Sequence, residues 1–285
     1  MKWPSAPHPQ ADLADLLPGA VDEGPGPVLG VDANAVPAYL GPGSGHVLLV
    51  AWPGTGSTTG LRTLAAQYAR RGTQVDILDV SGQHAWARAQ QRVQLYEDAA
   101  SVHRRLYQLA AQVRAERSGP ARTVLVESNQ TVTSLLRFRH YPDPGGTGLD
   151  ALTTVLATGR LHGIRVVMAC RAVPEPWGHL ARDLFSTRLL SAPTPRTWQL
   201  VGPPGAPAPQ TEPFRVGRMH LVGTGGDGLV QLLRLTDLQA AHLAATPPGA
   251  ARAPRLRCRL PVRPTATAPA ASAFQLPRTQ GDRRT

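Results

Sequence analysis

The chain has 285 residues, 42% of them hydrophobic, which is enough for one α/β domain with tails or for two small domains. No apolar run approaches the roughly 20 residues of a membrane span, and the N-terminus lacks a secretory leader pattern. We therefore expect a cytoplasmic protein, associated with a membrane only through a partner. Its two cysteines, Cys170 and Cys258, exclude a disulfide framework. The formal charge of +11 favours polyanionic partners.

Buried strand patterns alternate with helical patterns through the middle of the chain. Short apolar runs predict strands, and apolar residues at helical spacing predict helices. The predicted elements, in chain order, are a strand at 46–51, a helix at 61–71, a strand at 74–80, a helix at 98–117, a strand at 123–128, a helix at 149–162, and strands at 164–170, 186–191, 217–223 and 229–235. This order predicts an α/β fold with a three-layer, doubly wound, mostly parallel sheet, in which ligands bind at the carboxyl ends of the strands.

Composition shifts divide the chain into three parts. Residues 1–27 are rich in Pro, Gly and Ala and predict a flexible N-terminal arm, with one short helix at Ala11–Leu17. Residues 28–245 carry the strand and helix patterns. Residues 246–285 predict a disordered basic tail. Lys2 is the only lysine, and this arginine-rich usage is typical of a GC-rich genome such as an actinobacterial one.

A loop of small residues joins the first predicted strand to the first predicted helix. It reads W-P-G-T-G-S-T-T-G at residues 52–60. Glycines at such a turn let backbone N–H groups face an anion, and the helix N-terminus adds its dipole. A small-residue loop that binds no phosphate is the alternative. The candidate phosphate-binding residues are Gly54, Thr55, Gly56, Ser57, Thr58 and Thr59.

Two registers of this loop against the phosphate-loop motif G-x-x-x-x-G-K-[ST] are open. An ungapped count places Ser57 at the second glycine, Thr58 at the lysine and Thr59 at the magnesium-binding hydroxyl. Alignment on T-G-S instead places Thr59 at the lysine and Gly60 at the hydroxyl. Both registers put threonine where the motif has the lysine that neutralises the β and γ phosphates. Lys2 cannot replace it, because it lies far outside the motif.

Several segments, in order, resemble the FtsK/SpoIIIE family of DNA-pumping ATPases and the related ATPases of type VII secretion and actinobacterial conjugation. VLGVDANAVPAYL followed by GHVLLVAWPGTGSTTGLRTL resembles the approach to the family's Walker A loop. LDVSG resembles its D-P-K-G turn, and TVLVES its Walker B strand. ATGRLHGIRVVMACRAVPEPW, STRLLSAPTPRTWQLVG and GRMHLVG resemble three later segments. The resemblance covers residues 28–235 and implies a P-loop NTPase, RecA-like fold.

The departures from the family pattern fall on its chemical groups. The Walker B strand of the family ends in Asp-Glu, which serve the magnesium ion and the attacking water. Glu127 and Ser128 stand at these positions here. The family's Thr-Gln sensor is replaced by Cys170 and Arg171, and Arg196 matches an arginine of the family's S-R-T segment. Both arginines are either phosphate ligands or ordinary surface arginines.

The resemblance and its departures together predict a pseudo-ATPase. We assign no catalytic residue, and the scattered histidines predict no metal site. Weak binding of ATP and Mg²⁺ through the loop N–H groups stays open. The expected role is a non-hydrolysing accessory or regulatory subunit of a DNA translocation, plasmid transfer or secretion system. Its partners would be double-stranded DNA and an active FtsK-like ATPase, or further copies of itself in a ring. The alternatives are a DNA-binding protein that uses no nucleotide and an active but unorthodox ATP-binding DNA translocase.

Overall fold

The computed structural model describes residues 24–137, 146–209, 215–223 and 227–246. The predicted helix at Ala11–Leu17, Cys258 and nearly all of the predicted arm and tail lie outside these residues. Within them, no helix combines the length and the apolar character that crossing a bilayer requires.

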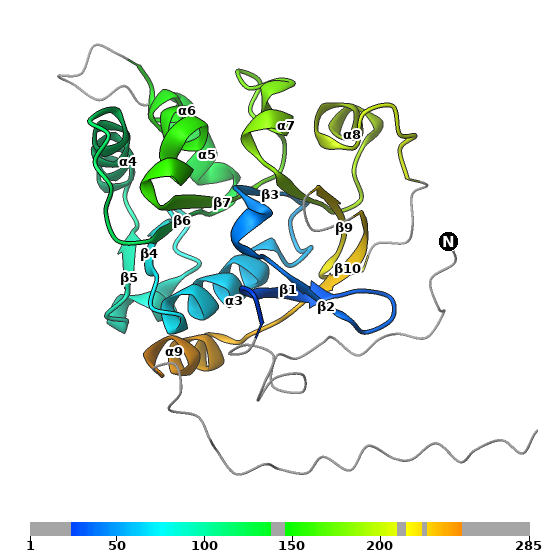
Figure 1. Cartoon of the computed structure of the whole chain (residues 1–285), viewed down its shortest axis with the longest axis horizontal. Coiled ribbons are helices and arrows are strands. Elements are labelled where there is room, and N and C mark those ends of the chain that lie inside the picture. The colour runs from blue at the N-terminus through cyan, green and yellow to red at the C-terminus, as the bar shows by residue number, and fades with distance from the viewer. Residues whose placement is uncertain (1–23, 138–145, 210–214, 224–226, 247–285) are drawn as a thin grey trace, which may run out of the picture. The chain divides into compact units, whose positions relative to one another are not determined.

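In the described residues, ten strands alternate with helices (Figure 1). The strands are β1 (Val28–Val31), β2 (Pro37–Tyr39), β3 (Val47–Val50), β4 (Gln74–Leu78), β5 (Val93–Tyr96), β6 (Arg122–Val126), β7 (Ile164–Cys170), β8 (Thr187–Leu190), β9 (Arg218–Gly223) and β10 (Gly228–Leu232). The α-helices are α3 (Ser57–Arg70), α4 (Ala99–Arg114), α5 (Ser128–Arg137), α6 (Gly148–Thr158), α7 (Leu180–Leu184), α8 (Pro195–Val201) and α9 (Asp237–Ala245). The short 3₁₀ helices of the described segments are η1 (Pro42–Ser44), η2 (Ala85–Ala89) and η3 (Gly159–His162).

All ten strands form one sheet in the order β2-β1-β10-β9-β8-β3-β7-β6-β4-β5. The six strands from β8 to β5 in this order run parallel, and the strands from β9 to β2 are antiparallel to their neighbours. The central parallel strands are buried except for the half-buried Arg122 and Arg165 near the starts of β6 and β7, as expected when helices cover both faces of a sheet. The predicted mostly parallel α/β sheet is therefore confirmed.

Helices cover both faces and give the predicted three layers. One core cluster joins α3 and α9 to one face, with Leu61 and Leu64 of α3 packed beside Leu49 of the sheet. The other joins α4, α5 and α6 to the opposite face, with Leu106 of α4 and Leu152 of α6 fully buried. Figure 1 shows the same separation, with α3 and α9 on one side of the strands and α4, α5 and α6 on the other.

The predicted elements of the central domain are present with small shifts at their ends. The strand predicted at 164–170 coincides with β7, and the helix predicted at 98–117 is α4 with Asp98 as its N-cap. The first helix begins at Ser57, four residues before the predicted start. Strands β1, β2 and β5 were not predicted, because each is short or interrupted by Gly or Pro.

Candidate functional site

The parallel strands end at one edge of the sheet, and the motif residues lie directly after these ends. The loop at 51–56 follows β3, Asp79 follows β4, Glu127 follows β6, and Arg171 follows β7. Neighbouring parallel strands place their carboxyl ends together, which is why ligands of such sheets bind at this edge. The structure therefore brings the predicted loop and Glu127 to one place.

The loop after β3 forms a turn built on two glycines. Gly54 has φ 80° and Gly56 has φ 96°, backbone conformations that other residues adopt only with strain. Thr55 is fully buried between them, and its hydroxyl donates to the carbonyl of Trp52 at 2.7 Å. The Thr55 carbonyl in turn accepts from the N–H of Gly217 at 2.7 Å. These two hydrogen bonds fix the turn through the buried Thr55.

Helix α3 starts where this turn ends. Gly56 is its N-cap, and no side chain among the described residues caps the helix at this point. The first N–H groups of a helix have no partner within the helix, so they and the helix dipole favour an anion. The loop therefore retains the backbone N–H groups of a phosphate site, without the lysine.

The helix start bears on the register of the loop. In the motif, the glycine-lysine pair lies where the loop turns into the helix. Gly56 and Ser57 occupy that place here, whereas both registers considered from the sequence put the second glycine at Ser57 or Thr58. The geometry favours a third register, in which Ser57 stands for the lysine and Thr58 for the magnesium-binding hydroxyl.

Glu127 lies beside the first turn of α3 and is almost fully buried, with 1% of its surface exposed. Its Oε1 accepts a hydrogen bond from the Thr58 hydroxyl at 3.0 Å. Its Oε2 lies 2.9 Å from Nε2 of His84, a side chain that is itself fully buried. Both oxygens of the carboxylate therefore contact protein donors.

The contacts of His84 assign its tautomer. Trp86 Nε1 can only donate, and it lies 3.3 Å from His84 Nδ1, so Nδ1 is the acceptor. A neutral imidazole then carries its proton on Nε2, which donates to Glu127. Burying a carboxylate is costly unless donors satisfy it, and Thr58 and His84 supply these donors.

Asp79 holds the segment that carries His84. Its Oδ2 accepts from the N–H groups of Gln83 at 2.6 Å and His84 at 3.1 Å. Its Oδ1 accepts from the N–H of Ser81 at 2.9 Å and from the Ser81 hydroxyl. Asp79 is fully buried, so its carboxylate serves this turn and positions His84.

These residues match a magnesium–triphosphate complex in one respect only. Thr58 lies at the hydroxyl position and contacts the acidic residue of the neighbouring strand, as the motif requires. A proton on His84 Nε2, however, faces the carboxylate oxygen that would hold the ion's water shell, and an N–H cannot ligate a cation. Ser57 offers no positive charge. Taken together, the residues do not fit this group.

The remaining predicted residues lie around this centre in different ways. Ser128 follows Glu127 at φ 70°, and its buried hydroxyl has no hydrogen-bond partner among the described residues. Arg171 stacks on the ring of Trp52 in the loop, with its guanidinium carbon 4.6 Å from the ring centroid. Arg196 is exposed on the first turn of α8, and no contact in the described parts of the chain joins it to the loop.

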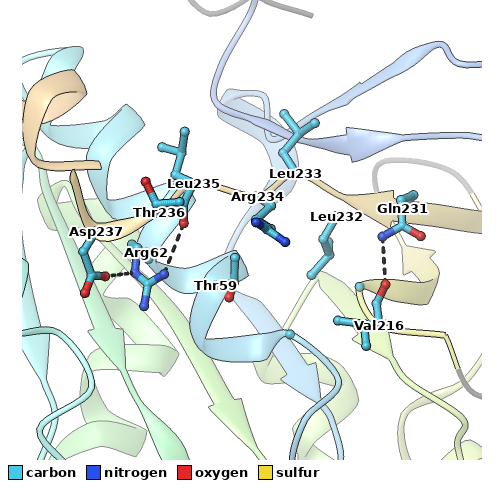
Figure 2. A pocket seen from close by; sticks show the side chains of 12 residues that line it. Thr59, Arg62, Val216, Gln231, Leu232, Leu233, Arg234, Leu235, Thr236 and Asp237 are labelled. Carbon is cyan, nitrogen blue, oxygen red and sulfur yellow. Dashed lines mark hydrogen bonds and ion pairs between the residues drawn. The ribbon is translucent and has the colours of Figure 1, made fainter. Parts of the chain in front are cut away.

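A pocket of about 400 Å³ opens beside the loop, between the start of α3 and the segment that follows β10. Figure 2 shows Thr59 and Arg62 of α3 on one side of it and Arg234 reaching in from the other. Arg62 forms an ion pair with Asp237 at 2.7 Å and donates to the Leu235 carbonyl at 3.1 Å. Thr58 and Glu127 do not line this pocket.

His84 is the residue of the site that sequence reasoning missed. It lies two residues beyond the LDVSG segment and outside that motif, so its spacing from Glu127 carries no information. One signal was present: Asp79 follows a buried strand and precedes Ser81 and Gly82, a pattern typical of a turn closed by an aspartate side chain.

No protein-family model and no curated protein matches the chain. Solved structures do. EccC of Thermomonospora curvata (ATPases 2 and 3, with a signal sequence peptide) is 19% identical with a TM-score of 0.63, over 80% of this chain and 44% of that one. The pCW3 conjugation coupling protein TcpA, a monomer with ATPγS, is 12% identical with a TM-score of 0.60, over 80% and 72%. The cytoplasmic domain of EssC is 14% identical with a TM-score of 0.58, over 80% and 48%.

These similarities concern the fold. The chain has the fold of the FtsK/SpoIIIE-type P-loop ATPases of secretion and conjugation, as the sequence resemblance implies. It spans less than half of the EccC and EssC chains that it matches.

Proposed function

We propose that the chain is a non-hydrolysing P-loop domain that acts as an accessory or regulatory subunit of a DNA translocation, plasmid transfer or secretion system. One observation carries this proposal: His84 donates a hydrogen bond to Oε2 of Glu127, so an N–H faces the oxygen that a metal ion and its water would need. In an active P-loop ATPase, the acidic residue at this strand end serves the metal and its water.

The proposed register explains the loss of hydrolysis in physical terms. Phosphoryl transfer depends on positioned positive charge around the phosphates. Ser57 takes the place of the lysine, and Ser128 takes the place of the base. Glu127 is left as a buried negative charge at the helix start, where it repels a phosphate. Arg171 is the nearby cation that the stacking on Trp52 holds at the loop, and it supports at most weak anion binding.

A domain that keeps the P-loop fold without the residues for hydrolysis can still act by binding to other subunits. The EccC structure contains more than one ATPase domain, and this chain matches 44% of its length. We propose by analogy that the partner is an active ATPase of the same fold or further copies of this chain. A cytoplasmic location is part of the same proposal, in analogy with the cytoplasmic domain of EssC.

Turnover of Mg²⁺-ATP by the full chain tests the proposal, with Ser57→Lys as the informative variant. We expect the unmodified chain to release no phosphate above background. Ser57→Lys adds a charge-assisted contact that stabilises binding by roughly 1.5–3 kcal/mol, so nucleotide affinity should rise about tenfold or more. Turnover should stay absent, because Ser128 cannot act as a base. Turnover by the unmodified chain that Gly56→Trp abolishes would overturn the proposal, since that variant blocks the loop.

A further inference from the structure

A second groove lies at the opposite edge of the sheet, where the parallel strands begin. It has a volume of about 410 Å³ and is lined by residues at the starts of β4, β6 and β7, by the end of α3 and by η3. No Asp or Glu lines it among the described residues. Four of its lining residues are arginines: Arg71, Arg122, Arg160 and Arg165.

Arg165 is held in this groove by neutral acceptors. It donates to the hydroxyl of Tyr68 at 2.9 Å and to the carbonyls of Gly41 and Pro42, each at 3.2 Å. Neutral acceptors fix a guanidinium in place without cancelling its charge. Arg165 also lies over the Tyr68 ring, 5.8 Å from its centroid, which orients it further.

The other arginines add positive charge on the same side. Arg160 is exposed at the groove and has no carboxylate partner in the described parts of the chain. Arg122 contacts Asp76 at 2.7 Å, but Asp76 also pairs with Arg105 at 2.7 Å, so two arginines share one carboxylate. The end of α3 contributes only about half a negative charge through its dipole. The groove therefore keeps a net positive charge.

The buried His46 responds to this charge. Its pKa is lowered to about 4, first by burial and then by Arg160, with a smaller contribution from Arg165. His46 is thus neutral at physiological pH and adds no titrating charge near the groove. Arginine stays protonated at every accessible pH, so the charge of the groove is constant above about pH 5.

We propose that this arginine groove binds the phosphate backbone of double-stranded DNA. The planar fork of arginine matches phosphate oxygens, and contacts to phosphates alone position a duplex without reading its sequence. The aromatic residue of the groove, Tyr68, is 5% exposed, so no ring is available to stack the bases of a single strand. The groove is concave and carries arginine over Pro, Gly and Thr, which does not suit insertion into a lipid bilayer.

This inference does not rest on the proposed function of the loop, since the two sites lie at opposite edges of the sheet. A chain that hydrolyses ATP could still bind DNA through the groove. A chain that does not hydrolyse ATP could equally fail to bind DNA. The two proposals therefore stand or fall on separate experiments.

Charge reversal at Arg160 tests the groove in the full chain, with Arg104→Glu as the matched control. Both side chains are exposed, and neither forms an ion pair among the described residues; Arg104 lies on α4, outside the groove. Both variants change the net charge equally, so any general effect of charge or of the basic C-terminal sequence is the same. Binding to a labelled 20-base-pair duplex, its single strand and phosphatidylserine vesicles is measured across a salt series.

We expect Arg160→Glu to weaken duplex binding roughly three- to tenfold more than Arg104→Glu does. The slope of log affinity against log salt should also fall by about 1 for the lost phosphate contact. Arg165→Gln, which keeps a polar side chain, should act in the same direction. Equal losses for Arg160→Glu and Arg104→Glu would overturn the proposal, as would binding to the vesicles or the single strand in preference to the duplex.

Discussion

The two edges of the parallel sheet hold their charged groups in opposite ways. At the carboxyl edge, Glu127 and Asp79 are buried and satisfied by N–H and O–H donors of the protein itself. At the amino edge, Arg160 and Arg165 face a groove, and Arg165 donates its hydrogen bonds to neutral oxygens of Tyr68, Gly41 and Pro42. An ionisable side chain remains available to a ligand when its partners are neutral and its surface is open. By this criterion, the acidic side chains at the carboxyl edge, where active P-loop ATPases bind phosphate, are unavailable to a ligand, and we call this edge closed. The arginines at the opposite edge are available, and we call that edge open.

The largest expected effect comes from removing the donor that closes the carboxyl edge. His84→Ala leaves the buried Glu127 carboxylate with an unfilled oxygen and creates a cavity beside it. We expect a loss of about 3 kcal/mol or more in the free energy of unfolding, measured by urea denaturation. The hydroxyl of Ser128 is buried at the same edge without a partner in the described chain, so the control Ser128→Ala should change stability by less than about 0.5 kcal/mol. Equal small losses for both variants would show that His84 does not satisfy Glu127.

A smaller effect is expected at the amino edge and depends on pH. The pKa of His46 is about 4 in the folded chain, against about 6.5 in an unfolded chain. The unfolded state therefore binds a proton first as pH falls, and stability is lost from about pH 6.5 down to pH 4. At pH 5 this group alone should cost about 2 kcal/mol.

His46→Gln tests this dependence while keeping an acceptor for the Val166 N–H, which His46 Nδ1 accepts at 2.9 Å. The loss of unfolding free energy between pH 7 and pH 5 should shrink by about 2 kcal/mol relative to the unmodified chain. The matched control variant is His242→Gln, at an exposed histidine on α9. A His46→Gln profile that overlays the unmodified one would show that the pKa of His46 is not lowered in the folded chain.

The sequence predicted the architecture better than the site, and particular residues show why. Strand β7 was predicted over its whole length because the apolar residues 166–170, together with Ile164, form a short buried run bounded by Gly163 and Arg171. The start of α3 was missed because Ser57, Thr58 and Thr59 have low intrinsic helix propensity, and tertiary packing overrides it. The observed start at Ser57 is what favours the third register of the phosphate loop over the two taken from the sequence.

Long-range pairing was the other limit. Thr58 and Glu127 are 69 residues apart, and His84 and Glu127 are 43 residues apart, so no local pattern links them. The groove arginines come from segments as distant as α3, β6, η3 and β7, and each one alone looks like an ordinary surface residue. The absence of a lysine from the loop is evident from the sequence alone. The structure adds that Ser57 stands at the lysine position.

The most direct test of the closed carboxyl edge is calorimetric titration of the full chain with ATP, with and without Mg²⁺, compared with Glu127→Gln. A buried carboxylate beside the loop repels phosphate, so neutralising it should raise affinity for ATP about threefold or more. Mg²⁺ should leave the affinity of the unmodified chain unchanged, with any binding at millimolar concentrations. Micromolar binding that requires Mg²⁺ and is lost in Glu127→Gln would show instead that Glu127 holds a metal ion, and the account of a closed edge would be wrong.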